Sequence, residues 1–223
     1  TGMAVVKTCE TLRKKICERG AEYLGCSADD VEFDGEKVVN LKTKEEITRK
    51  EIGNRVMCSS NAPLSATEAF SSPVSPPPFM VGIAEVEIDK ETGVVEPIDY
   101  AAVVDCGTVV NPNLARVQTE GGIAQGIGMA LYEDIVYSEK GKNYSNSFMQ
   151  YKIPSRLDVG EIRVEFESSY EPTGPFGAKS IGEIVINTPS PAISNAIQNA
   201  VGVIVRELPI TAEKVYRGMT EKE

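Results

Sequence analysis

One carboxylate in this sequence is placed where it could serve as a catalytic base. Glu183 ends the glycine- and proline-rich run 174–183, and the apolar residues 184–186 follow it directly. Glycine and proline let a loop turn tightly and approach a ligand closely, and apolar neighbours that exclude water raise the proton affinity of a carboxylate. The run therefore predicts a base at the edge of apolar material. The alternative is an ordinary loop glutamate surrounded by water, which is the commoner situation for this residue type.

Other kinds of chemistry are restricted by the residue types present. The sequence contains no histidine, which is the commonest metal ligand and the usual imidazole base. The cysteines form no CxxC pair, so neither a zinc site nor an iron–sulfur cluster is indicated. We expect reduced, partly buried thiols at Cys9, Cys17, Cys26, Cys58 and Cys106. Any acid–base step must then use a carboxylate.

The composition is that of a globular protein with an acidic balance. With 223 residues and 41% hydrophobic content, the chain can bury the core of one large domain or two smaller ones. A formal net charge of −10 argues against a nucleic-acid surface, which needs clustered Lys and Arg. No apolar run reaches about eighteen residues and no secretory signal pattern is present, so we expect no membrane span and a cytoplasmic location. The start at Thr1–Gly2 suggests a piece of a longer polypeptide or a processed subunit.

Residues 1–58 are expected to form a subdomain built from a helix and a hairpin. Apolar residues three or four positions apart predict an amphipathic helix over 4–24, which Gly25 would end. Asp34–Gly35 is a tight-turn signal between two apolar stretches, and it predicts a β-hairpin.

A short helix and a connector are expected to follow. Thr48 and Glu51 have the spacing of a capping box, which predicts a helix through about Val56. Residues 59–78 are rich in Ser and Pro and can form neither a helix interior nor a central strand. A connector of this length usually lies across another surface, and we expect it to wrap over a partner chain.

Residues 79–223 are expected to form an α+β domain that carries the glycine-rich loop. Alternating apolar residues over 79–89 and again over 94–105 flank a turn, which predicts a long antiparallel hairpin. The stretch 101–104 is apolar on both faces, so this strand should be central in its sheet.

The predicted helix 114–132 is unusual because it contains several glycines. Each costs about 1 kcal/mol relative to alanine inside a helix. Close approach to another helix, a backbone or a bulky ligand would explain them, and simple helix packing with solvent-facing polar groups is the alternative. Gln118, on the same helix, can donate and accept hydrogen bonds without carrying charge. The glycines are Gly121, Gly122, Gly126 and Gly128.

A last strongly apolar helix is predicted beyond Glu183. Ser190–Pro191 supplies a cap and a first-turn proline, and apolar residues recur at helical spacing from Ile193 to Val205. Its N-terminus should point towards Glu183 and offer positive potential to an anionic group.

Four ordered motifs give the sequence a specific resemblance. Together they resemble the xanthine dehydrogenase and aldehyde oxidase family of molybdenum hydroxylases, in the C-terminal part of the molybdopterin-binding subunit. The likeness covers nearly the whole chain. The motifs are Asp105–Gly107 with Asn111–Pro112, Gln118–Gly121 with Gln125–Gly128, Tyr151–Pro154, and Gly177–Glu183.

The resemblance implies a fold, a cofactor and a reaction. The fold would be α+β, with mixed sheets and packed helices of the molybdenum-cofactor-binding type. The cofactor would be molybdopterin carrying molybdenum, in a dinucleotide form, with no direct protein ligand to the metal. An N-heterocycle or aldehyde carbon would be hydroxylated with oxygen from water, and hydride would pass to the molybdenum centre.

The resemblance also assigns roles to particular residues. Glu183 would be the base that takes a proton from a molybdenum-bound hydroxyl. Gln118 would hydrogen-bond the cofactor near the metal, and Asn111 would contact its dinucleotide end. The backbone around Lys179, Ser180 and Gly182 would line the same cavity, so these three are further cofactor-binding candidates.

Partners follow from what the sequence lacks. The family's upstream pterin loops, iron–sulfur motifs and flavin site are absent from this chain, so the resemblance implies the rest of the molybdopterin subunit, an iron–sulfur subunit and an FAD subunit as partners. The chain alone should not be active. One alternative is a catalytically silent assembly or interaction domain that keeps the fold without cofactor, and another is an unrelated α+β binding module with coincidental motifs.

Overall fold

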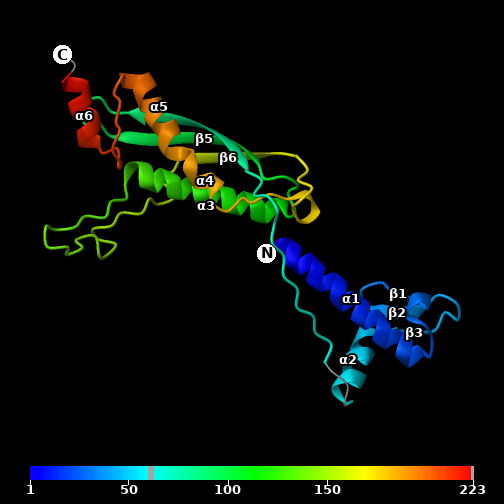
Figure 1. Cartoon of the computed structure of the whole chain (residues 1–223). Coiled ribbons are helices and arrows are strands. Elements are labelled where there is room, and N and C mark those ends of the chain that lie inside the picture. The colour runs from blue at the N-terminus through cyan, green and yellow to red at the C-terminus, as the bar shows by residue number, and fades with distance from the viewer. Residues whose placement is uncertain (60–62, 222–223) are drawn as a thin grey trace. The chain divides into compact units, whose positions relative to one another are not determined.

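The computed structural model describes residues 1–59 and 63–221 and consists of two compact units, Thr1–Pro73 and Val74–Glu223 (Figure 1). Each unit has its own hydrophobic core, and the two cores share no residue.

The first unit combines two α-helices with a small antiparallel sheet in the order β1-β2-β3. The predicted helix, hairpin and short capped helix are all confirmed. Gly25 ends the first helix with a left-handed backbone at φ 65°, and the Thr48 hydroxyl accepts a hydrogen bond from the Glu51 amide at 3.2 Å. The short third strand was not predicted. The elements are α1 (Gly2–Leu24), η1 (Ala28–Asp30), β1 (Val31–Phe33), β2 (Lys37–Asn40), β3 (Glu46–Thr48) and α2 (Arg49–Met57).

Aliphatic side chains form the core of the first unit. Val38 and Ile52 are completely buried, and Val38 fills the space above Gly20 of α1, where a Cβ would lie 2.7 Å from a Val38 methyl group. Residues 60–62 of the predicted connector lie outside the described residues, and its described part, residues 59 and 63–78, contains no helix or strand. Its first part runs along α1, because Lys15 Nζ donates to the Ser65 carbonyl at 2.6 Å. Wrapping over a partner chain stays a prediction.

The second unit is built on a three-stranded sheet with β5 at its centre, as predicted. β4 (Phe79–Ile88) and β5 (Val95–Asp105) form the expected antiparallel hairpin, with an irregularity between Glu85 and Val86. β6 (Glu161–Glu167) pairs with β5 in parallel, so the chain must cross from one end of the sheet to the other between them. The sequence had not indicated this parallel pairing.

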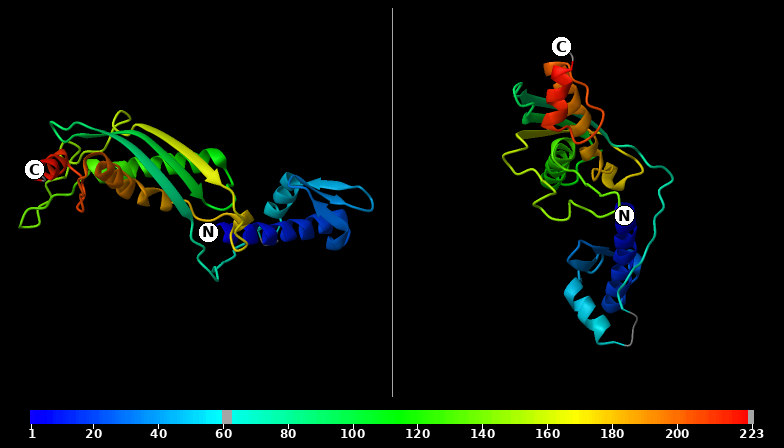
Figure 2. Two further views of the ribbon diagram at one scale, coloured as in Figure 1. Left: turned by 90° about the horizontal axis from the view of Figure 1, so that it is seen from above. Right: turned by 90° about the vertical axis from the view of Figure 1, so that its left-hand side faces the viewer.

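Helix α3 (Pro112–Leu131) makes that crossover, and it lies with α5 (Pro189–Val201) against one face of the sheet (Figures 1 and 2). The two helices share a buried core with the sheet, in which Ile123 of α3 and Ile193 of α5 have no exposed surface. Three shorter helical segments complete the unit: η2 (Pro175–Gly177), α4 (Ile184–Asn187) and α6 (Ala212–Thr220).

The predicted bounds of the last apolar helix are wrong at both ends. α5 begins at Pro189 with Thr188 at its N-cap position, ahead of the expected Ser190–Pro191 start, and it ends at Val201 rather than reaching Val205. Gly202, in a left-handed conformation, ends it. In addition, the one-turn helix α4 lies between Glu183 and α5, so the N-terminus of α5 does not directly follow the glutamate.

None of the helices that the structure describes covers the opposite face of the β4-β5-β6 sheet. Val81 is 65% exposed, Ile83 is 68% exposed, and Val103, paired with Val81, is 48% exposed.

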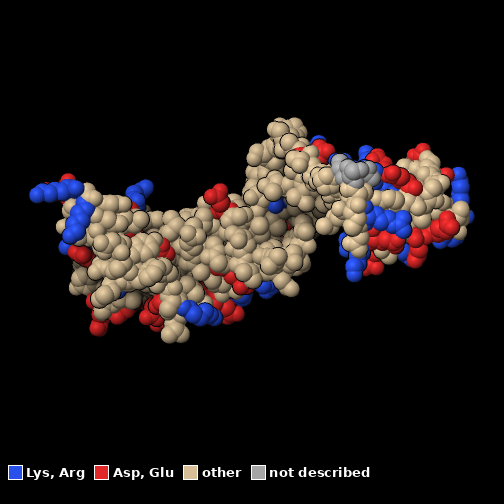
Figure 3. Space-filling model, turned by 90° about the horizontal axis from the view of Figure 1, so that it is seen from below, with Lys and Arg blue, Asp and Glu red and all other residues tan. Residues whose placement is uncertain are grey.

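The two units differ in surface charge. Charged side chains cover the first unit densely, whereas the middle of the second unit shows few on the face seen in Figure 3. Within the described residues, no helix has the length and apolar character needed to cross a bilayer.

Candidate functional site

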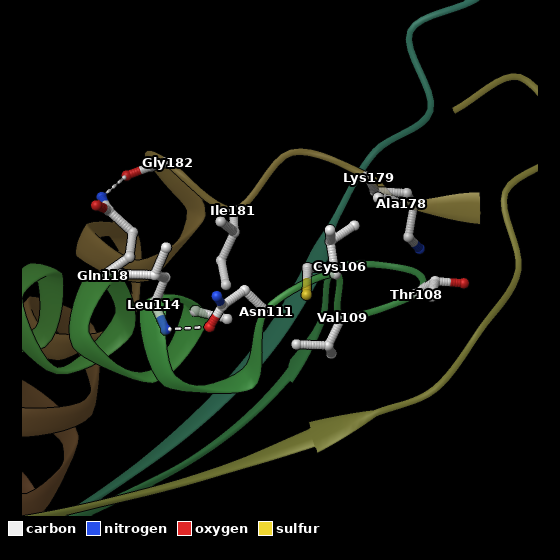
Figure 4. A pocket seen from close by; sticks show the side chains of 12 residues that line it. Cys106, Thr108, Val109, Asn111, Leu114, Gln118, Ala178, Lys179, Ile181 and Gly182 are labelled. Atoms are coloured by element: carbon white, nitrogen blue, oxygen red, sulfur yellow. Dashed lines mark hydrogen bonds between the residues drawn. The ribbon is translucent and has the colours of Figure 1, made fainter. Parts of the chain in front are cut away.

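The candidate site lies where the start of α3 meets the loop that leads to Glu183. The turn after β5 and the first turns of α3 form one wall, and Ala178, Lys179, Ile181 and Gly182 form the other (Figure 4). Between them is a pocket of about 400 Å³, and among its lining residues are Asn111, Gln118, Lys179 and Gly182. These are four of the six residues that the sequence singled out.

Asn111 stabilises the start of α3, in addition to any role in binding. It is the N-cap of α3, and its Oδ1 accepts a hydrogen bond from the Leu114 amide at 3.0 Å. Because the cap uses the oxygen, the NH₂ group is the part of this side chain that can meet a ligand without disturbing the helix.

Gln118 joins the two walls of the pocket. Its Nε2 donates to the Gly182 carbonyl at 3.1 Å, over a sequence separation of 64 residues (Figure 4). A second, smaller pocket of about 300 Å³ lies on the other side of this contact and includes Glu183 and Gly121. Gln118 and Gly182 line both pockets, so a large ligand could extend across the pair and meet the glutamate at one end.

Glu183 lies beside the helix that carries Gln118, as predicted from its motif, but its surroundings differ from the expected ones. It is exposed and occupies the N-cap position of α4 without making a side-chain cap. The expectation of an apolar, water-poor environment is therefore wrong for this chain by itself. The apolar residues that follow it form α4, where Val185 is buried against Gly122 of α3, and this packing does not cover Glu183.

The glycines of α3 fall into two groups, one required for helix packing and one not. A Cβ at Gly122 would collide with the Val185 side chain, and one at Gly126 would lie 2.5 Å from Pro189. These two residues allow α4 and the start of α5 to approach α3 closely. Gly121, in contrast, is exposed, has no neighbouring atom within 4 Å of the position that a Cβ would take, and borders the pocket that contains Glu183. Protein packing does not account for Gly121.

The loop segment around Lys179 was expected to line the cavity with its backbone, and Lys179 and Gly182 do line the pocket. The Lys179 ammonium turns towards the protein, where Nζ donates to Asp105 Oδ2 at 2.6 Å, and the side chain is only 8% exposed. Ser180 is exposed and is not among the lining residues of the pocket. A cofactor-binding role for these residues stays a prediction.

Asp105, the last residue of β5, was not assigned a role from the sequence. It accepts hydrogen bonds from Lys179, from the Ser169 hydroxyl at 2.6 Å and from the Gly107 amide at 3.0 Å. These bonds, the one from Lys179 above all, lower the pKa of the Asp105 carboxyl from 3.8 to about 2. The sequence placed Asp105 in the Asp105–Gly107 motif, at the end of a predicted central strand, but gave no partner for its carboxylate.

The residues of the site suit an organic ligand better than a bare metal ion. Within the described part of the chain, no group of three or more His, Cys, Asp or Glu residues is arranged to hold a metal. Burial raises the pKa of the Cys106 thiol at the pocket wall, so this group stays neutral. Amide groups and open glycines that face shared space fit a large, polar, hydrogen-bonding cofactor.

Comparison with known proteins identifies the family. A family model of the molybdopterin cofactor-binding domain matches residues 1–160. The chain therefore belongs to this family, and the predicted resemblance is confirmed. The matched region contains Asn111 and Gln118 and ends before Glu183.

Individual relatives extend the likeness to nearly the whole chain. The chain is similar to the probable hypoxanthine oxidase XdhD of Escherichia coli (strain K12), with 34% identity over 98% of this chain and 23% of the relative. It is also similar to the 6-hydroxypseudooxynicotine dehydrogenase complex subunit gamma of Paenarthrobacter nicotinovorans, with 30% identity over 96% of this chain and 28% of the relative. The chain thus spans about a quarter of the length of these relatives.

A solved structure supports the fold. The quinoline 2-oxidoreductase of Pseudomonas putida 86 superposes with a TM-score of 0.75 and 27% identity, over 95% of this chain and 28% of that chain. The predicted fold class, α+β with mixed sheets and packed helices of the molybdenum-cofactor-binding type, is confirmed.

Proposed function

We propose that this chain supplies the base-bearing part of the active site of a molybdenum hydroxylase. The observation that carries the proposal is the position of Glu183, which shares a pocket with Gly121 and Gln125 of α3 and adjoins the larger pocket across the Gln118–Gly182 contact. The family and the names of the relatives support an oxidoreductase that uses a molybdopterin cofactor. When bound, that cofactor supplies the redox chemistry and the oxygen transfer.

The chain's own residues would bind and orient the cofactor. The larger pocket would accept it, with the Asn111 NH₂ group and the free hydrogen of the Gln118 amide as donors. Backbone groups of Lys179 and Gly182 would line its other side. We assign the dinucleotide end to the neighbourhood of Asn111, because Asn111 lies at the opposite end of the pocket's α3 wall from Glu183.

Glu183 would hold and move the proton. A general base must lie within hydrogen-bonding reach of the proton it removes, and its pKa must suit the working pH. In this chain Glu183 is exposed and lines the smaller pocket. A bound cofactor, a substrate and the rest of the subunit would exclude water from that pocket.

The missing functions would come from partners. The relatives are about four times longer than this chain, and one of them is named as a subunit of a complex. We therefore assign the pterin-binding loops to the remainder of the molybdopterin subunit, and electron transfer to an iron–sulfur subunit and an FAD subunit. The substrate would be an N-heterocycle or an aldehyde. A cytoplasmic location stays a prediction.

Replacement of the glutamate tests the proposal. In the enzyme purified with its natural partner polypeptides, Glu183→Gln should lower kcat by about 10²-fold or more, the range expected for removal of a general base. Molybdenum and pterin content should not change, because the chain keeps its shape. Glu165→Gln is the matched control, since Glu165 is an exposed glutamate of β6 outside both pockets.

The same measurements distinguish a catalytic role from that of a silent assembly domain. If Glu183→Gln and wild type turn over substrate at rates within twofold, Glu183 is not the base. If the purified wild-type complex contains no molybdenum at all, the chain is the silent assembly domain instead.

A further inference from the structure

Lys179, in the loop that leads to Glu183, is held by both its main chain and its side chain. The Lys179 amide donates to the Cys106 carbonyl at 2.7 Å, and its ammonium donates to Asp105 at 2.6 Å. The ammonium also lies 5.3 Å from the centre of the Phe79 ring at the start of β4. A residue bound in this way cannot shift or rotate without breaking several contacts together.

Asp105 connects this residue to two further segments. Its carboxylate accepts from the Gly107 amide in the turn after β5 and from Ser169 in the segment after β6. The side chain is 21% exposed, so bulk water screens these charge-assisted bonds only in part. One carboxylate thus ties together the ends of two parallel strands and the loop.

The backbone contact next to this ion pair is unusually close. Gly107 and Ala178 form an isolated antiparallel bridge, and the Thr108 amide donates to the Gly177 carbonyl at 2.8 Å. A Cβ at Gly107 would collide with the Gly177 carbonyl oxygen, and the φ of +70° at Gly107 is one that side chains rarely adopt. The turn after β5 and the start of the loop are therefore packed in direct backbone contact, without space for a side chain at Gly107.

Glu183 follows this fastened residue closely. Glu183 is four positions after Lys179, and a stretch of four residues can span at most about 14 Å when fully extended. At the far end, Gln118 holds the Gly182 carbonyl from α3. The direction in which the chain leaves Lys179 consequently decides where the Glu183 carboxylate lies relative to the pockets.

We propose that Asp105 and Lys179 form a positioning clamp that sets the location of Glu183, with Ser169 as its support. This inference rests on the proposed function of Glu183 as the base. Neither clamp residue needs to touch the substrate with its charged group, since each of those groups is occupied by the other. The clamp differs from an ordinary stabilising ion pair in that its loss should affect the reaction through Glu183.

Lys179→Met tests the clamp in the enzyme purified with its partner polypeptides. It removes the ammonium and keeps an unbranched apolar side chain. A displacement of the base of about 1 Å can cost about 10²-fold in rate, so we expect kcat to fall by about that factor while KM changes less than about threefold. Hydrogen exchange should accelerate at residues 177–183, and molybdenum content should be retained.

Arg163→Met is the matched control. Arg163 pairs with Asp99 of strand β5, its Nε donating to Asp99 Oδ1 at 3.0 Å, but the pair is on the surface and does not touch the loop. Loop exchange and kcat should stay at wild-type values in this variant. If Lys179→Met fails to assemble, Ser169→Ala gives a milder test, with faster loop exchange and a fall in kcat of a few fold.

A double variant separates positioning from general stability. When Glu183 is already Gln, Lys179→Met should cause no further loss of kcat, because a positioning residue acts only through the group it positions. A further loss of about tenfold, or unchanged exchange at 177–183 in Lys179→Met, would overturn the clamp. If Glu183→Gln alone leaves turnover unchanged, the proposed base is wrong, whereas the exchange measurement still reports whether Lys179 holds the loop.

Discussion

The two ends of the loop 177–183 are bound to the protein in very different ways. At the first end, Gly177 and Lys179 meet the turn after β5 through main-chain hydrogen bonds and an ion pair with Asp105. At the other end, Gly182 meets α3 through the Gln118 amide, and Glu183 is exposed. The fold thus fixes where the loop starts and leaves its end open to ligands and partners.

The two ends therefore differ in what the loss of a contact should change. Contacts at the fastened end join residues of this chain to one another, so their loss should lower the free energy of unfolding, and loss of the Asp105–Lys179 pair should in addition lower turnover through Glu183. At the open end Gly182 and Glu183 adjoin pockets, so changes there should affect binding and turnover with little cost to folding. Four substitutions can test this difference, here in order of decreasing effect on stability.

Gly107→Ala should damage the fastened end most. The new methyl group would collide with the Gly177 carbonyl, and φ +70° adds backbone strain, so we expect a loss of about 3 kcal/mol in unfolding free energy. Gly141→Ala is the control, because Gly141 has φ +76° but nothing within 4 Å of a Cβ. Urea unfolding should show a loss of only about 1 kcal/mol for the control. Equal losses in both variants would mean that the close approach at Gly107 costs nothing.

Asp105→Asn should reduce stability in a pH-dependent way. The folded-state pKa of about 2 lies below the ordinary 3.8, so the ionised carboxylate stabilises the fold above about pH 4, and this contribution disappears as the pH falls towards 2. The shift corresponds to about 2 kcal/mol at pH 7. Unfolding free energies of wild type and variant should therefore differ at pH 7 and converge only as the pH falls below 4 towards 2. A difference independent of pH would exclude the carboxylate charge as its cause.

Gly121→Ala should separate folding from function at the open end. Alanine is favoured over glycine inside a helix by about 1 kcal/mol, and no atom obstructs the new methyl group, so Tm should rise. The same methyl group would enter the pocket beside Glu183, and kcat/KM should fall. Gly122→Ala is the opposite control, since it collides with Val185 and should lower Tm. A stabilised Gly121→Ala enzyme with full activity would show that this space is not used.

Gln118→Ala should affect stability least. Its contact with the Gly182 carbonyl is exposed, so its removal should cost about 0.5 kcal/mol. Cofactor retention, measured as molybdenum per chain, should fall more clearly than Tm. Unchanged retention would place the cofactor away from this amide.

Local sequence patterns predicted most of the elements but not their long-range contacts. Helix α1 and both hairpins followed from periodicity and turn residues, because those signals lie within a few positions of one another. The parallel pairing of β6 with β5 and the meeting of Asp105 with Lys179 bring together residues 62 to 74 positions apart. No local pattern reveals such a meeting.

The candidate site shows the same limit. The family resemblance placed Gln118, Gly182 and Glu183 at one site, and these three residues adjoin in the structure. The expected burial of Glu183 did not follow: Glu183 is exposed, whereas Val185, two residues later, is buried against Gly122 of α3. This contact joins residues 63 positions apart, which sequence periodicity over four residues cannot reveal.

The uncovered sheet face has a practical consequence for work with this polypeptide. Val81, Ile83 and Val103 place three sizeable aliphatic side chains in water on adjacent strands, one of which is an edge strand. Produced without companions, the polypeptide should self-associate or require detergent. Its yield of monodisperse material should improve when the longer remainder of the subunit is co-expressed, which makes gel filtration a quick first assay for the correct companion.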